Sequence, residues 1–152
     1  MTPETRLKDL GITLPEPTAA VANYLPVIED AGVITVSGQL PMRDGQLTCT
    51  GYVGKDVSVD DAYQAARLCA INGLALIKQA AGGSLDNVRI LRVGGFVASA
   101  PGFTGQPKVI NGASDLLVEV LGDRGRHARA AVGVAELPLG AAVEVEFTAR
   151  IL

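Results

Sequence analysis

The stretch from residue 129 to residue 150, RAAVGVAELPLGAAVEVEFTAR, constrains the fold of this chain more than any other. Valines alternate with smaller residues over positions 129–134, residues 137–140 interrupt the alternation, and positions 143–147 resume it. Alternation at a period of two is typical of strands that bury one face. The stretch therefore predicts two strands joined by a short loop as a β-hairpin with one apolar face.

The opposite face of this predicted hairpin mixes charged and very small side chains. Because successive side chains of a strand point to opposite sides, we expect Arg129, Ala131 and Gly133 to share that face with Glu144 and Glu146. The simplest interpretation is the solvated face of an antiparallel sheet. The lack of bulk beside an arginine also leaves room for a ligand or for a second subunit.

Two segments resemble a known protein family. The string ARAAVGVAELPLGAAVEVE, with its Arg-(x)8-Pro-(x)5-Glu-x-Glu spacing, and SGQLP at residues 37–41 resemble the reactive intermediate deaminase family, also called RidA or YjgF. The resemblance runs from about Tyr24 to the C-terminus, so residues 1–23 form an N-terminal extension of a single domain, 1–152. It implies a chorismate-mutase-like α+β fold, a mixed sheet with two helices on one face, and a homotrimer with clefts between subunits.

The pattern along the chain predicts the order strand, strand, strand, helix, strand, helix, strand, strand. Asp44-Gly45 between apolar runs predicts a tight turn, because glycine accepts a positive φ. Ser58 followed by Asp61 predicts the start of a helix, and Gly82-Gly83 predicts its end. Both main helices should cover one sheet face. The other face has no covering element, which favours oligomerisation.

Several further residues carry local predictions. A short helix should begin near Thr5 and end at Gly11, and Asn111 is predicted to cap the second main helix. Gly73 within the first main helix indicates close packing. Gly94-Gly95 within the strand at residues 88–98 indicates a bulge or a close backbone approach.

Composition excludes several classes of protein. A net charge of −3, a pI near 5.1 and the lack of tryptophan argue against nucleic acid as a partner. No secretory signal and no run of about 18 apolar residues occurs, so we expect a cytoplasmic protein that does not span a membrane. Cys49 and Cys69 should then be free thiols. His127 is the single histidine, which argues against a histidine-based metal site and against a metal requirement; we expect it at the rim of the cleft without a catalytic role.

The resemblance implies a role for each matching residue. Arg129 would hold the carboxylate of a 2-imino acid, and Glu144 would position or activate the water that attacks the imine carbon. The products would be a 2-keto acid and ammonia, with no metal or organic cofactor. An arginine fork grips a carboxylate with two parallel hydrogen bonds. Further residues implied in substrate binding are Tyr24, Ser37, Gly38, Phe96, Asn111 and Ala131.

Some of these assignments have local alternatives. Ser37 could form a hydrogen bond within its strand, and Asn111 could serve only as a helix cap. Ala131 stands where the family commonly has a cysteine, so activity is preserved if only the backbone amide there contacts the ligand.

Two other functions remain open at this stage. A trimer could bind keto acids or similar small carboxylates without catalysis, as a sensor or scavenger. Endoribonuclease activity is a historical label of the family, and the acidic pI and scarce aromatic residues argue against it.

Overall fold

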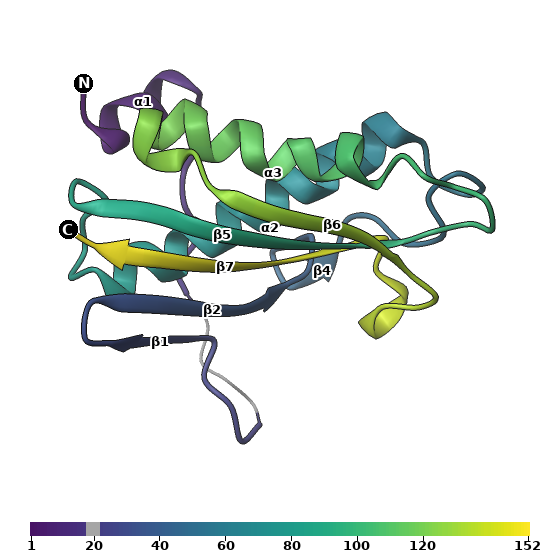
Figure 1. Ribbon diagram of the computed structural model, residues 1–152, viewed down its shortest axis with the longest axis horizontal. Coiled ribbons are helices and arrows are strands. Elements are labelled where there is room, and N and C mark those ends of the chain that lie inside the picture. The colour runs from purple at the N-terminus through teal and green to yellow at the C-terminus, as the bar shows by residue number, and fades with distance from the viewer. Residues whose placement is uncertain (18–21) are drawn as a thin grey trace.

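The computed structural model describes residues 1–17 and 22–152, and it shows helices packed against one face of a mixed five-stranded sheet (Figure 1). The strand order is β1-β2-β7-β5-β6, and β3 pairs with β4 in a separate small hairpin. The elements in chain order are α1 (Pro3–Asp9), β1 (Val27–Asp30), β2 (Val33–Gln39), β3 (Met42–Arg43), β4 (Gln46–Leu47), α2 (Val59–Ala80), β5 (Val88–Ala98), α3 (Gln106–Leu121), the short 3-10 helix η1 (Gly122–Gly125), β6 (Ala128–Val134), the 3-10 helix η2 (Pro138–Gly140) and β7 (Val143–Ile151). The predicted α+β class with a mixed sheet is confirmed.

The two long helices, α2 and α3, lie on the same face of the sheet, as predicted. In Figure 1 they run behind the strands and along the upper edge of the sheet. Helix α2 contacts β2 and β7, whereas α3 contacts β5 and β6. No helix of the described ranges covers the other sheet face, which we call the open face.

The predicted hairpin of residues 129–150 is wrong, because β6 and β7 do not pair with each other. Strand β5 lies between them, parallel to β6 and antiparallel to β7. The reason is the helix that precedes β6. A strand, a helix and a second strand place the two strands parallel and side by side, so α3 returns the chain to the start of β5. Strand β7 then occupies the other edge of β5.

This pairing changes which side chains share a face. Glu144 is in register with Phe96 on β5, and Phe96 is in register with Val132 on β6. The neighbours of Glu144 along its strand, Val143 and Val145, are fully buried beneath the helices. Glu144 therefore lies on the open face.

Arg129 lies on the opposite, helix-covered face. It is in register with Val93, which is in register with Phe147, and both of these side chains are in the core. Ala131 also packs against the core. A Cβ added at Gly133 would lie 2.8 Å from Nε2 of Gln106 in α3. The prediction that Arg129, Ala131 and Gly133 share a face with Glu144 is therefore wrong.

The first long helix begins and ends as the sequence predicts. The Ser58 hydroxyl accepts a hydrogen bond from the backbone N–H of Asp61, and the chain takes positive φ angles at Gly82 and Gly83 after the helix. Gly73 packs against the aromatic ring of Phe147, since an added Cβ would lie 2.4 Å from Cε2. Close packing is confirmed as the reason for this glycine.

The start of the second long helix is not where the sequence placed it. Helix α3 begins at Gln106, after Gly105, with Pro107 in its first turn, a position that proline favours. Asn111 therefore lies inside the helix and does not cap it. Its side chain instead accepts a hydrogen bond from Arg129.

The paired glycines of β5 mark close approaches. A Cβ at Gly95 would lie 2.5 Å from the Ile110 side chain of α3, and a Cβ at Gly94 would lie 2.6 Å from Oε1 of Glu146. The irregularity of the strand lies elsewhere, between Ile90 and Arg92. The second alternative of the prediction, a close approach, is thus the one observed.

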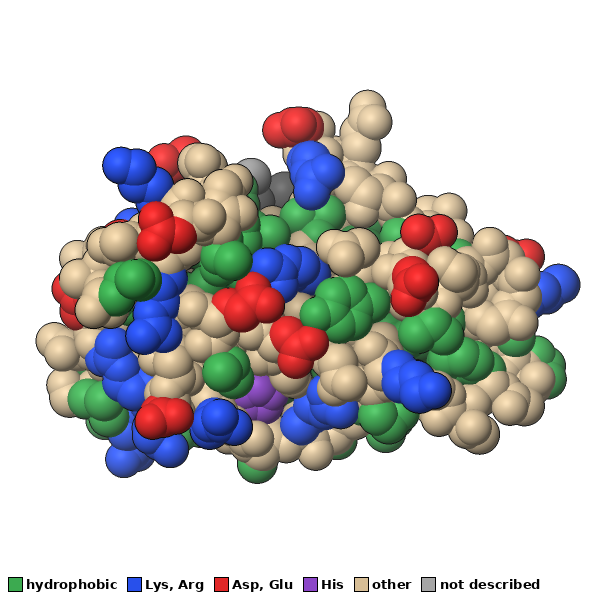
Figure 2. Space-filling view, turned by 90° about the horizontal axis from the view of Figure 1, so that it is seen from above, with side chains coloured by type: hydrophobic (Ala, Val, Ile, Leu, Met, Phe, Trp, Pro, Cys, Tyr) green, Lys and Arg blue, Asp and Glu red, His purple; other side chains and the backbone are tan. Residues whose placement is uncertain are grey.

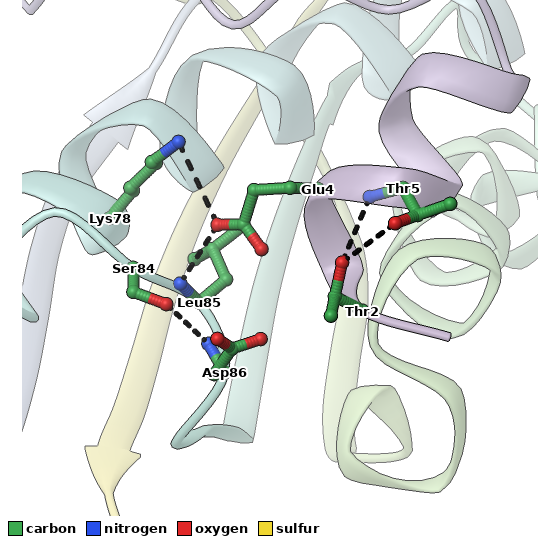
Figure 3. Close-up of polar contacts among 7 residues, drawn as sticks. All are labelled: Thr2, Glu4, Thr5, Lys78, Ser84, Leu85 and Asp86. Atoms are coloured by element: carbon green, nitrogen blue, oxygen red, sulfur yellow. Dashed lines mark hydrogen bonds and ion pairs between the residues drawn. The ribbon is translucent and has the colours of Figure 1, made fainter.

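The N-terminal helix is docked onto the body of the domain. Leu7 is buried, and the Glu4 carboxylate accepts a hydrogen bond from the Leu85 N–H at 3.3 Å and lies 3.7 Å from Nζ of Lys78 (Figure 3). The Thr2 hydroxyl accepts from the Thr5 N–H and caps the helix. The segment therefore contributes to the core.

The remaining local predictions are largely confirmed. Asp44 and Gly45 both have positive φ angles in the turn between β3 (Met42–Arg43) and β4 (Gln46–Leu47). Cys49 and Cys69 are free. Within the described ranges, no helix is both long and apolar enough to cross a membrane.

Candidate functional site

Arg129 is held by neutral acceptors on α3. Its Nη1 donates to Oδ1 of Asn111 at 2.9 Å and to Oγ of Ser114 at 3.1 Å, and its Nη2 donates to the Pro107 carbonyl at 3.3 Å. No acidic side chain of residues 1–17 or 22–152 forms an ion pair with it. These bonds leave Nε–H and one N–H of Nη2 without an acceptor in the described ranges. Two free N–H groups of one guanidinium can donate together to a carboxylate.

The hydrogen bonds continue from Ser114 to the single histidine. Nε2 of His127 lies 2.9 Å from Oγ of Ser114, and Nδ1 lies 2.6 Å from the Gly125 carbonyl. Since a carbonyl only accepts, Nδ1 carries a proton, and the Ser114 hydroxyl donates to Nε2 of the neutral ring. Burial first, and then the charge of Arg129, lower the pKa of His127. Figure 2 shows the face that carries α3, with acidic and basic side chains along it.

Glu144 forms the second candidate group, on the open face. A Cβ at Gly38 would lie 1.9 Å from its Oε1, so the carboxyl group lies directly over the β2 backbone. Burial, followed by the nearby Glu146, raises the pKa of Glu144. Glu146 is paired with Arg92 at 3.6 Å, whereas Glu144 has no basic partner in the described part of the chain. A half-buried carboxyl with a raised pKa suits proton transfer.

The other predicted residues divide between the two groups. Phe96 is half-buried beside Glu144 in the sheet register. The Ser37 hydroxyl donates to the Leu25 carbonyl at 2.7 Å, a bond to the segment before β1 and not within its own strand. This bond ties β2 to the segment that carries Tyr24, whose side chain is exposed.

One chain therefore brings its predicted residues together in two places. Gly38, Phe96 and Glu144 gather on the open face, whereas Arg129 and Asn111 lie on the helix-covered face at the edge of the sheet. The sheet itself separates the guanidinium from the Glu144 carboxyl. A site that uses both groups needs a second copy of the chain.

The sequence analysis missed Ser114 and gave His127 no partner in the Arg129 network. Ser114 follows Asn111 by three positions on α3, a spacing that places both on one helix face. His127 precedes Arg129 by two positions on an extended segment, which places their side chains on the same side. These spacings show which side chains share a face within each element. They do not show that α3 packs beside β6, which is what brings the two pairs together.

One groove of the described surface lies away from both groups. It has a volume of about 700 Å³ and lies between α2 and the β3–β4 segment. The residues that line it include Arg43, Cys49, Asp61, Gln64 and Arg67. None of the predicted site residues lines this groove, so its volume alone does not identify it as the functional site.

The mixed sheet with two helices on one face defines an α+β domain of the chorismate-mutase-like class. The chain belongs to the YjgF/chorismate mutase-like family, whose model, described as "YjgF/chorismate_mutase-like, putative endoribonuclease", matches residues 4–151. The match includes α1, which lies before the segment that carried the resemblance in the sequence.

Individual relatives are similar over nearly the whole chain. Protein TCP17 of Trypanosoma cruzi is 47% identical over 142 residues, which are 92% of this chain and 88% of that protein. The crystal structure of Atu1372 from Agrobacterium tumefaciens, a protein described as of unknown function, is 50% identical, with a TM-score of 0.92 and coverage of 99% and 94% of the two chains. A "putative endoribonuclease" from Shewanella oneidensis MR-1 is 37% identical, with a TM-score of 0.94 and coverage of 99% and 100%.

Proposed function

We propose that this protein hydrolyses reactive 2-imino acids, or the enamines in equilibrium with them, to 2-keto acids and ammonia. The observation that carries the proposal is the environment of Arg129. Neutral acceptors hold its guanidinium, no acidic side chain of the described ranges neutralises it, and two of its N–H groups remain for a ligand carboxylate. The family, which includes the RidA deaminases, supports the same substrate class.

Glu144 supplies the proton transfer in this proposal. Its carboxylate accepts a proton from the water that attacks the imine carbon, and the acid form returns that proton to the departing nitrogen. A raised pKa lies closer to neutral pH, where the carboxylate accepts a proton efficiently and the carboxylic acid donates it efficiently. Imines hydrolyse readily in water, so orientation of the reactants and one proton shuttle suffice.

The separation of Arg129 and Glu144 within one chain leads us to propose a site between copies. The edge of one copy, with Arg129, would face the open sheet surface of the next, with Glu144 and Gly38. A cyclic trimer closes such contacts without leaving an unpaired surface. Water exclusion at the contact would strengthen the grip of the guanidinium on a carboxylate.

A coupled assay tests the activity. A pyridoxal-phosphate dehydratase generates 2-iminopropionate, and the release of pyruvate and ammonia is followed with and without the protein. The Glu144→Gln variant should lose turnover but keep its affinity for pyruvate, because the carboxylate grip at Arg129 is intact. The Arg129→Gln variant should lose both. Arg126→Gln, at an exposed ion pair with Asp123, is the matched control and should behave as the unaltered protein.

The same measurements separate the alternatives. Pyruvate binding without acceleration of any imine, in the unaltered protein, would favour a non-catalytic binder of small carboxylates. Full turnover by Glu144→Gln would remove the proposed role of that residue. Unchanged pyruvate affinity in Arg129→Gln would refute the carboxylate site.

A further inference from the structure

The chain of hydrogen bonds behind Arg129 is not used by the proposed chemistry. It runs from the Gly125 carbonyl through His127 and Ser114 to Nη1 of the guanidinium, with separations of 2.6, 2.9 and 3.1 Å. Each bond has a defined direction when the imidazole is neutral: Nδ1–H donates to the carbonyl, the Ser114 hydroxyl donates to Nε2, and Arg129 donates to the Ser114 oxygen. The serine oxygen is thereby oriented with a lone pair toward the arginine.

We propose that Ser114 and His127 are positioning residues that hold the Arg129 guanidinium with its free N–H groups directed at the substrate carboxylate. This inference rests on the proposed function and names further residues of the same site. Arginine side chains lose much rotational freedom when they bind, so an arginine fixed in advance binds a carboxylate more tightly. Asn111 and the Pro107 carbonyl hold the same group from α3, and the Ser114–His127 arm ties it to the Gly125 carbonyl of η1.

A serine beside a histidine also raises the possibility of a nucleophile. The geometry argues against it, because Arg129 donates to the Ser114 oxygen and so withdraws the lone pair that would attack. The serine also lies in the middle of α3, away from the backbone N–H groups of a helix start that could stabilise an oxyanion. Ser114 is thus placed to orient the guanidinium.

Protonation of His127 is coupled to the ligand by the same geometry. The charged group that acts on the ring is Arg129 on β6; α3 faces it with the Ser114 hydroxyl, and η1 with the Gly125 carbonyl. Asp123 and Arg126 pair with each other at the surface. A carboxylate bound to Arg129 offsets the positive charge that lowers the pKa of His127, so binding should raise that pKa. By reciprocity, the carboxylate should bind more tightly when the ring is protonated.

The first test uses the unaltered protein and its single histidine. In ¹⁵N-labelled protein the imidazole gives one spin system, which should show the Nδ1–H tautomer. Saturation with pyruvate should move the midpoint of its pH titration upward. An Nε2–H tautomer, or a midpoint that does not move with pyruvate bound, would overturn the inference without any substitution.

The second test uses variants and isothermal titration with pyruvate. Loss of one hydrogen bond to the guanidinium should raise the Kd roughly fivefold in Ser114→Ala, and His127→Phe should do the same. The two changes together should cost little more than either alone, because both break one chain. Ser114→Thr keeps the hydroxyl and should restore affinity. In the imine assay KM should rise while kcat changes little, since Glu144 is untouched.

Ser84→Ala is the matched control, because its hydroxyl accepts only a local bond from the Asp86 N–H. The positioning role would be refuted if Ser114→Ala and His127→Phe bound pyruvate with the Kd of the unaltered protein while Arg129→Gln lost binding. That result would leave the proposed function standing. Binding retained in Arg129→Gln would instead refute the proposed function. Covalent labelling of Ser114 by phenylmethylsulfonyl fluoride would overturn the positioning role in favour of a nucleophile.

Discussion

Replacing Gly112 by alanine should separate the two long helices. Gly112 lies where α3 crosses α2, and an added Cβ would lie 2.0 Å from the Tyr63 carbonyl oxygen and 3.2 Å from the Arg67 nitrogen. Ordinary contacts require about 3.5 Å. The obstacle is helix backbone, which cannot rotate away as a side chain can. The helices must therefore move apart by roughly 1.5 Å at this point.

The cost can be worked from these contacts. Overpacking of this kind costs about 1–3 kcal/mol and more where backbone must shift, while alanine in a helix interior gains about 1 kcal/mol over glycine. Separation also weakens two bonds between the helices, Tyr63 to Asp115 at 2.7 Å and Arg67 to Glu119 at 2.8 Å. We expect a net loss of roughly 2 kcal/mol in the free energy of unfolding, or a Tm lower by about 4–8 °C for a chain of this length.

The assay is urea unfolding followed by circular dichroism at several protein concentrations. Gly73→Ala is the comparison, because its obstacle is the Phe147 ring, which can tilt, so its loss should be smaller. Gln79→Ala, exposed on α2, should change stability by less than about 0.5 kcal/mol. A Gly112→Ala variant as stable as the unaltered protein, or a larger loss in Gly73→Ala, would refute this account of the helix contact.

Three other predictions concern the proposed site. Glu146→Gln removes a negative charge that raises the pKa of Glu144, so the acidic limb of the kcat/KM profile against pH should move to lower pH. An acidic limb at the same pH would contradict its assignment to Glu144. Gly38→Ala should displace the Glu144 carboxyl and lower kcat about tenfold or more with little change in Tm, because the flexible side chain can move; unchanged turnover would exclude that position for the carboxyl. Co-expressed Arg129→Gln and Glu144→Gln chains should recover up to about one quarter of normal activity if each site is shared between neighbours in a ring, and no recovery would place both groups in one chain.

Local features of the fold were predictable from the sequence because their causes are local. The Ser58 cap, the positive φ angles at Gly82 and Gly83 and the Asp44-Gly45 turn each depend on a few adjacent residues. The strand at Val88–Ala98 was also predicted with its observed bounds, since its apolar residues continue to the turns on both sides. These elements follow from steric and hydrogen-bonding rules within a few residues.

The candidate site was predictable only as a set of residues. Arg129 and Glu144 were selected by chemistry and by resemblance, and their roles remain predictions. Their placement was wrong, because alternation shows which residues of one strand share a face but does not identify the neighbouring strand. The tie between Arg129 and Asn111 could not be predicted while Asn111 was interpreted as a cap.

The sequence by itself determined the two long helices, the strand at Val88–Ala98 and the set of residues proposed to bind a carboxylate. Only the tertiary structure decided that β5 lies between β6 and β7, which places Arg129 and Glu144 on opposite faces. The physical reason is that strand pairing depends on the path of α3 across the sheet and on burial of β5 between two neighbours. The same crossover brings Ser114 of α3 beside His127 and Arg129. Contacts between residues so placed arise from packing of whole elements, which no local pattern encodes.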